Sequence, residues 1–99
     1  MADQRAILRK AAAEAHSAGR TAEALAAYAG YLALAPDEAG MWSNLGVLHR
    51  RAGQHLMALR AHRRALALDP DGASTMNNAA NVMSDIGMYD ESIALRRRV

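Results

Sequence analysis

Repetition at a fixed spacing constrains this chain more than any other feature of its sequence. When the chain is shifted by 34 residues against itself, these sets fall in register: Gly19, Gly53 and Gly87; Pro36 and Pro70; Asn44 and Asn78; and the Leu-Ala-Leu segments 32–34 and 66–68. Glycine and proline recur where helices end, because glycine adopts the left-handed backbone readily and proline cannot continue a helix. We therefore expect stacked copies of one two-helix unit.

The middle copy carries the clearest motif. It reads Trp42-x-x-Leu45-Gly46-x-x-His49, then Ala58-x-x-x-His62, then Ala65 and Pro70. This resembles the tetratricopeptide repeat, with its pattern W-x-x-L-G-x-x-Y, then A-x-x-x-F, then A and P. His49 and His62 replace aromatic residues of that pattern. We expect them to fill space between paired helices, with one ring nitrogen reaching water or the backbone.

The resemblance covers nearly the whole chain and implies an all-α fold. Three antiparallel helix pairs would stack into a right-handed superhelix, with repeats at 5–38, 39–72 and a truncated 73–99, in one domain spanning 1–99. The composition agrees, because the chain is rich in alanine, lacks phenylalanine and has only 4% aromatic residues. The expected helices span 3–17, 21–35, 39–52, 55–69, 73–86 and 89–98.

In this family the first helix of each repeat lines a concave groove that binds peptides. Carried onto this sequence, the groove residues are Arg9, Lys10, His16, Asn44, Arg50, Arg51, Asn77, Asn78 and Asn81. Asn44 and Asn78 share one position in adjacent repeats, and an amide can bond to a peptide backbone as donor and acceptor. Such a ladder resembles the grooves of O-linked N-acetylglucosamine transferases and their bacterial SPINDLY-type relatives. The alternative is that these asparagines only support local turns.

Positive charge is the second feature of the expected groove. The chain carries a net charge of +2, and four of the groove residues above are basic. An acidic segment or a terminal carboxylate would be attracted there. The carboxylate clamp of chaperone-binding relatives would fall on Arg9, Ala13, Asn44, Ser74 and Asn78, where only Arg9 and Asn44 agree with it. We therefore do not expect a clamp for chaperone tails.

Several functional classes are not expected from this sequence. There is no cysteine, the four histidines do not form a metal-binding motif, and neither a phosphate-binding loop nor a nucleophile elbow is present. We thus predict no catalytic residue, no metal site, no cofactor and no enzymatic activity. No run of about 18 apolar residues exists, so we expect no membrane partner and a cytoplasmic location. The arginine pairs 63–64 and 97–98 lack aromatic neighbours for base stacking, so we do not expect nucleic acid as a partner.

The sequence favours a bacterial protein-interaction module that binds an extended peptide or partner segment in its groove. One alternative is a non-catalytic, substrate-recruiting part of a larger enzyme such as a glycosyltransferase. Another is a scaffold that forms homo-oligomers through the C-terminal helix, where Ile93 and Val99 would be partly exposed.

Overall fold

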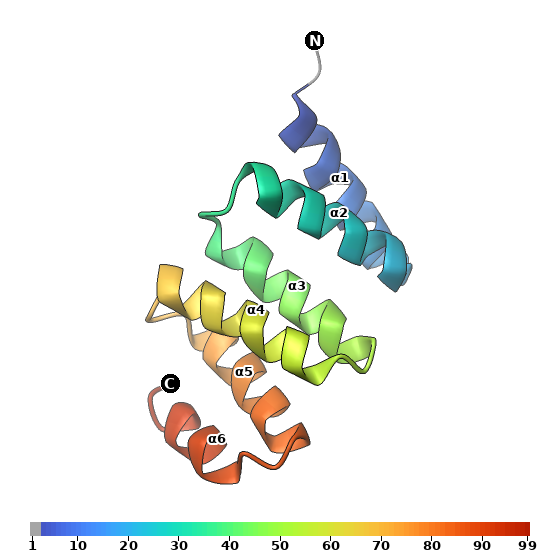
Figure 1. Cartoon of the computed structure of the whole chain (residues 1–99). Helices are drawn as coiled ribbons and strands as arrows, with labels where there is room; N and C mark the ends of the chain where they lie inside the picture. The colour runs from blue at the N-terminus through green and yellow to red at the C-terminus, as the bar shows by residue number, and fades with distance from the viewer. Residues whose placement is uncertain (1–2) are drawn as a thin grey trace.

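The computed structural model describes residues 3–99, which form six α-helices and, within that range, no strand. The helices are α1 (Gln4–Ser17), α2 (Thr21–Leu34), α3 (Ala39–Arg51), α4 (His55–Leu68), α5 (Ala73–Asp85) and α6 (Tyr89–Arg96). They form three antiparallel pairs that follow one another along an elongated body of 49 × 25 × 18 Å (Figure 1). The all-α helix-pair prediction is confirmed.

Glycine ends the first helix of each pair as the sequence predicted. Gly19, Gly53 and Gly87 have φ angles of 75°, 77° and 83°. After Gly19, the amide of Arg20 donates to the carbonyl of Ala15 at 2.9 Å, the bond that closes a Schellman turn. Most predicted helix ends are within one residue of those observed. The last helix was predicted too long, since α6 ends at Arg96 and leaves Val99 outside it.

The first helices, α1, α3 and α5, occupy a different layer from the second helices, α2, α4 and α6 (Figure 1). Each pair packs internally, and α2 packs on α3 as α4 packs on α5. In addition α3 contacts α5 directly across the junction between pairs. The first helices of the second and third pairs therefore lie against each other at this junction.

The core is continuous from pair to pair because α4 is buried on two faces. Ala61 of α4 packs with the first cluster, around Tyr28 and Leu48, while Ala58 and Leu59 pack with the second, around α5 and α6. The small side chains of Ala58 and Ala61 let the neighbouring helices approach α4 closely. Each helix pair therefore relies on its neighbour to cover its apolar face.

Candidate functional site

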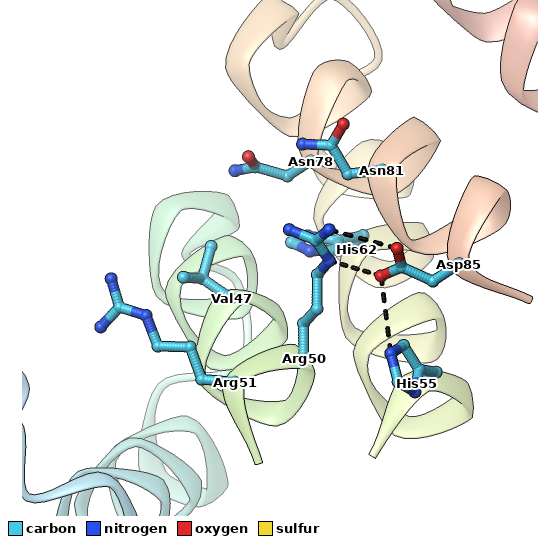
Figure 2. Close-up of a pocket in the computed structure, with 8 residues that line it drawn as sticks. All are labelled: Val47, Arg50, Arg51, His55, His62, Asn78, Asn81 and Asp85. Carbon is cyan, nitrogen blue, oxygen red and sulfur yellow. Dashed lines mark hydrogen bonds and ion pairs between the residues drawn. The ribbon is translucent and has the colours of Figure 1, made fainter. Parts of the chain in front are cut away.

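A polar cavity of about 600 Å³ opens where the second helix pair meets the third. We call it the α3–α5 cavity; its lining residues are Val47, Arg50, Arg51, His55, His62, Asn78, Asn81 and Asp85 (Figure 2). The successive first helices α3 and α5 supply six of these side chains, and α4 supplies the two histidines. The side of the stack that carries the first helices is thus hollowed at this junction.

Arg50 is fixed within the α3–α5 cavity by a carboxylate from the next repeat. Its Nε donates to Oδ2 of Asp85 at 2.5 Å and its Nη2 donates to Oδ1 at 3.2 Å. This two-point contact holds the pKa of Asp85 below its usual range. Nη1 of Arg50 has no hydrogen-bond partner within residues 3–99, so one edge of the guanidinium stays available inside the cavity (Figure 2).

His62 lies behind Arg50 at the bottom of the cavity (Figure 2). It is fully buried, and neither Nδ1 nor Nε2 has a hydrogen-bond partner among the described residues. Burial, reinforced by the charge of Arg50, lowers its pKa to about 4, so the ring is neutral at pH 7. Neither nitrogen of His62 has a backbone partner in residues 3–99, and the ring packs against the backbone of Gly46.

A related cavity of about 550 Å³ lies one repeat earlier. This α1–α3 cavity is lined by Ala13, His16, Ser17, Gly19, Tyr28 and Arg51. Five of these residues stand 34 positions before lining residues of the α3–α5 cavity, in the pairs 13 and 47, 16 and 50, 17 and 51, 28 and 62, and 51 and 85. The repeat in the sequence therefore reappears as a repeat of the cavity.

Tyr28 fills the inner end of the α1–α3 cavity with its hydroxyl. That hydroxyl lies 3.0 Å from Nδ1 of His16 and forms a hydrogen bond with it. Burial raises the pKa of Tyr28, and a hydrogen bond from Asn44 acts in the opposite direction. Tyr28 is thus satisfied by its neighbours, in contrast to His62 at the equivalent position.

The predicted groove residues divide into three groups. Arg50, Arg51, Asn78 and Asn81 line the α3–α5 cavity, and His16 lines the α1–α3 cavity. Asn44 lies against Tyr28, so the two members of the expected ladder have different surroundings. Arg9, Lys10 and Asn77 line neither cavity.

The positive charge expected along the groove is reduced by ion pairs. Arg9 binds Glu38 and stacks on Tyr31, with its Cζ 4.9 Å from the ring centroid. Lys10 lies 4.0 Å from Glu14, and Arg50 is paired with Asp85. Arg51 forms no ion pair within residues 3–99 and lines both cavities. It therefore provides the unpaired positive charge at the centre of the groove.

Four residues that line the α3–α5 cavity are absent from the predicted groove residues: Val47, His55, His62 and Asp85. His62 was assigned to packing between paired helices, and Nε2 of His55 lies 3.5 Å from Oδ2 of Asp85. One feature of the sequence could have identified His62 as a cavity residue. It is the replacement of an aromatic residue of the repeat pattern by a shorter histidine ring. In the first repeat the equivalent position is Tyr28, which lines the α1–α3 cavity.

Clustered metal ligands and membrane-spanning helices were both sought among residues 3–99 because either would define a different kind of site. No group of three histidine, cysteine, aspartate or glutamate side chains in residues 3–99 is placed to hold a metal ion. In the same range, no helix combines the length and apolar character needed to cross a membrane. The side chains that line the α3–α5 cavity include arginine, asparagine and aspartate, which can form hydrogen bonds and ion pairs.

Comparison with known proteins places the chain in a family. A family model described as the tetratricopeptide repeat matches residues 37–99. The chain belongs to the tetratricopeptide repeat family. Among curated proteins, no sequence matches this tetratricopeptide chain significantly.

Solved tetratricopeptide domains share its fold. The TPR2B domain of yeast Sti1, in a complex with pHsp70, superposes with a TM-score of 0.90 at 17% identity, over 96% of this chain and 76% of that one. The TPR domain of Arabidopsis OM64 superposes with a TM-score of 0.88 at 14% identity, and the match covers 94% of this chain and 77% of that one. The Sgt2 TPR domain from Aspergillus fumigatus superposes with a TM-score of 0.88 at 18% identity, and the match covers 98% of this chain and 64% of that one. At these identities the likeness concerns the fold.

Proposed function

We propose that this tetratricopeptide chain binds an extended segment of a partner protein along the side of the stack that carries the α1–α3 and α3–α5 cavities. Tetratricopeptide domains are protein-interaction modules. The observation that carries the proposal is the pair of equivalent cavities one repeat apart, joined by Arg51. A segment in an extended conformation suits such a site, because it can present groups to both cavities in succession.

The lining of the cavities favours a polar and acidic segment. Asn78 and Asn81 offer amide donors and acceptors that can bond to a peptide backbone. The side-chain oxygen of Asn81 accepts from Nη2 of Arg96 at 2.6 Å, so its NH₂ group is left to donate. Arg51 adds a positive charge without a competing ion pair in residues 3–99. Acidic partners would therefore associate faster and more tightly than basic ones.

A charge reversal tests this proposal. A displayed library of random twelve-residue peptides would be selected on the wild-type chain, and the selected peptides measured against Arg51→Glu. Arg63→Glu is the matched control, because Arg63 is exposed on α4 and lines neither cavity. We expect Arg51→Glu to weaken binding at least about tenfold and the control to change it less than about twofold. Equal effects of the two substitutions would exclude the groove as the binding surface.

The asparagine ladder is tested separately. Asn78 lines a cavity, whereas Asn44 lies against Tyr28. We expect Asn78→Ala to weaken the selected peptides more than Asn44→Ala does, by roughly fivefold or more for a lost hydrogen bond. If neither single variant nor the double variant changes affinity, the ladder has no part in binding.

Self-association through α6 is a second candidate, supported by exposed apolar side chains. Tyr89, Ile93 and Val99 are 64%, 50% and 58% exposed at that end of the stack. A patch of this kind favours contact with a second apolar surface. Light scattering over a concentration series of wild type and Ile93→Glu tests it, and a wild-type chain that stays monomeric at about 1 mM, far above the Kd of a specific dimer, would dismiss it.

Recruitment of a substrate for a larger enzyme, such as a glycosyltransferase, remains a prediction from the resemblance of the ladder. The coding sequence that follows Val99 in the native gene tests it. A catalytic domain in the same reading frame would support that role, and a stop codon would remove it.

A further inference from the structure

A smaller and more apolar pocket lies on the second helix pair, away from the α3–α5 cavity. We call it the outer pocket; it measures about 260 Å³ and is lined by Trp42, Leu45, His49, Met57, Arg60, Ala61 and Arg64. None of these residues lines the α3–α5 cavity. At 3.6 residues per turn, the two sets of lining residues are centred about 160° apart around both α3 and α4. The outer pocket and the α3–α5 cavity therefore open on nearly opposite sides of the same helix pair.

The inner part of the outer pocket is apolar. Leu45 and Ala61 are buried in the first core cluster, and Trp42 packs against that cluster from a half-buried position. Met57 lines the pocket and is 46% exposed, so apolar surface continues from the core to solvent. Pockets that bind drug-sized ligands measure roughly 300 Å³ or more. The outer pocket is smaller than these and suits one side chain of a partner.

Two exposed arginines, Arg60 and Arg64, line the outer pocket one turn apart on α4. Neither takes part in an ion pair within residues 3–99, and α4 contains no acidic residue. Cζ of Arg64 lies 5.8 Å from the centroid of the Trp42 ring, close enough for attraction between the cation and the ring face. A guanidinium held over a ring can still donate from its edges to a carboxylate. The pocket thus combines an apolar interior with uncompensated positive charge.

The fold does not require this combination of residues. In the first repeat the positions of the two arginines are taken by Ala26 and Gly30, and the position of Trp42 is taken by Leu8. Leu8 lies directly on Gly30, because a Cβ atom on residue 30 would stand 3.4 Å from Cδ2 of Leu8. The same antiparallel helix pair is therefore formed without a cation at either position. Packing of the pair does not explain the two arginines, which leaves them available to a partner.

We propose that the outer pocket is a second docking site, which takes one aromatic side chain of a partner protein. A carboxylate next to that side chain in the partner pairs with Arg60 and Arg64. The site is on the other side of the stack from the groove, so this inference goes beyond the proposed function. It would allow one chain to hold two partner segments at once.

The lining explains why the occupant is aromatic and belongs to a protein. The sulfur of Met57 and the ring of Trp42 both interact favourably with an aromatic ring, and aromatic side chains are frequent anchors at interfaces. An anionic membrane would instead require a broad apolar face flanked by basic residues. Here Leu45 and Ala61 are buried beneath the surface, where a single inserted side chain can reach them.

Small-molecule probes test the pocket without a known partner. Trp42 is the only tryptophan and lines the pocket, so its fluorescence reports on binding there. The probes are 4-phenylbutyrate, which carries a ring and a carboxylate, its neutral amide 4-phenylbutyramide, and acetate, which has no ring. We expect a saturable change of the emission with 4-phenylbutyrate, at least about tenfold weaker binding of the amide and no saturable change with acetate. Equal responses to the acid and the amide, or to the acid and acetate, would overturn the proposal.

Charge reversal on α4 provides a matched set of variants. We expect Arg60→Glu and Arg64→Glu each to weaken binding of 4-phenylbutyrate at least about tenfold. Arg63→Glu is the control, because Arg63 is exposed on the same helix and does not line the outer pocket. Circular dichroism would verify that all three variants are folded. If the control weakened the probe as much as the other two do, general attraction to α4 would replace the proposed site.

A second pair of variants tests the apolar interior. Met57→Gln keeps the length of the side chain but makes the wall of the pocket polar, and we expect it to weaken 4-phenylbutyrate about fivefold or more. Leu56→Gln is the control, since Leu56 is 69% exposed and does not line the outer pocket. Undiminished binding by a folded Met57→Gln chain would contradict insertion of the ring.

Other occupants of the pocket would be recognised in the same experiments. Binding to phosphatidylglycerol vesicles that Arg63→Glu weakens as much as Arg60→Glu, together with silent probes, would assign the arginines to a membrane and overturn the proposal. Emission of Trp42 that changes with protein concentration in the absence of any probe would assign the pocket to a second copy of the chain, with the same consequence. Silent probes with library peptides that depend on Arg51 would overturn the outer pocket and leave the groove function standing.

Discussion

The imidazole of His62 lies directly on the backbone of Gly46. A Cβ atom on residue 46 would stand 2.5 Å from Cε1 of the ring and 2.7 Å from both ring nitrogens. The ring is fully buried, so it has little freedom to move away. Glycine at this position of the repeat therefore serves the contact between α3 and α4.

Gly46→Ala should consequently destabilise the chain. Overpacking against a rigid buried ring costs roughly 1–3 kcal/mol of unfolding free energy. Urea denaturation followed by the fluorescence of Trp42, the only tryptophan, measures it. In a His62→Ala background the same substitution should cost much less, because the ring it meets has gone. Equal costs in both backgrounds would show that the contact is not the cause.

The depressed pKa of His62 makes stability depend on pH. Its value is about 4 in the folded chain, against an ordinary value of 6.5. Above pH 6.5 the ring is neutral in both states and the stabilisation is complete. Between pH 6.5 and 4 the unfolded chain binds the proton more readily, so the free energy of unfolding falls as pH falls, by on the order of 3 kcal/mol.

The control for this pH dependence is His62→Tyr, which does not titrate in that interval. The other three histidines contribute equally to both chains, so the difference between the two stability curves reports residue 62. We expect the wild-type curve to fall more steeply below pH 6.5 when both are measured by urea denaturation. Parallel curves would mean that the ring has an ordinary pKa.

Gly53 has a specific backbone requirement. Its φ of 77° is in the left-handed region, and nothing lies within 4 Å of an added Cβ, so Gly53→Ala tests backbone strain alone. We expect a loss of roughly 1 kcal/mol. Gly40→Ala is the matched control, because its Cβ also meets nothing and it lies within α3 with ordinary dihedrals. Thermal unfolding should show a lower Tm for the first variant and an unchanged or higher Tm for the second.

Trp42 ties the second repeat to the end of the first. Its Nε1 donates to the carbonyl of Pro36 at 2.8 Å across the turn before α3. Trp42→Phe keeps an aromatic ring but removes this donor, and we expect it to lower stability by about 0.5–1.5 kcal/mol. Circular dichroism must follow unfolding here, since the fluorophore is removed. If the Trp42→Phe variant unfolds at the same urea concentration as the wild-type chain, the hydrogen bond makes no net contribution to stability.

Local signals in the sequence located most helix ends. Glycines that require a left-handed backbone and prolines that cannot extend a helix act within a few residues, so Gly19 and Pro36 bounded α2 to within one residue. The end of α6 was predicted less well because the sequence offers neither residue after Arg96. The 34-residue register directed attention to Arg50, Arg51 and Asn78, which line the α3–α5 cavity, and also to Asn77, which lines neither the α1–α3 nor the α3–α5 cavity.

The sequence by itself determined the repeat, the helix pairs and the side of the stack that carries the polar residues, because each depends on short-range backbone preferences and on periodicity. Only the tertiary structure decided that Arg50 bonds Asp85, that Glu38 neutralises Arg9 and that His62 has no hydrogen-bond partner. The two ion pairs join residues that are 35 and 29 positions apart, and the burial of His62 depends on neighbours from more than one helix. They depend on the distances between side chains after packing, which the composition and spacing of the chain do not specify.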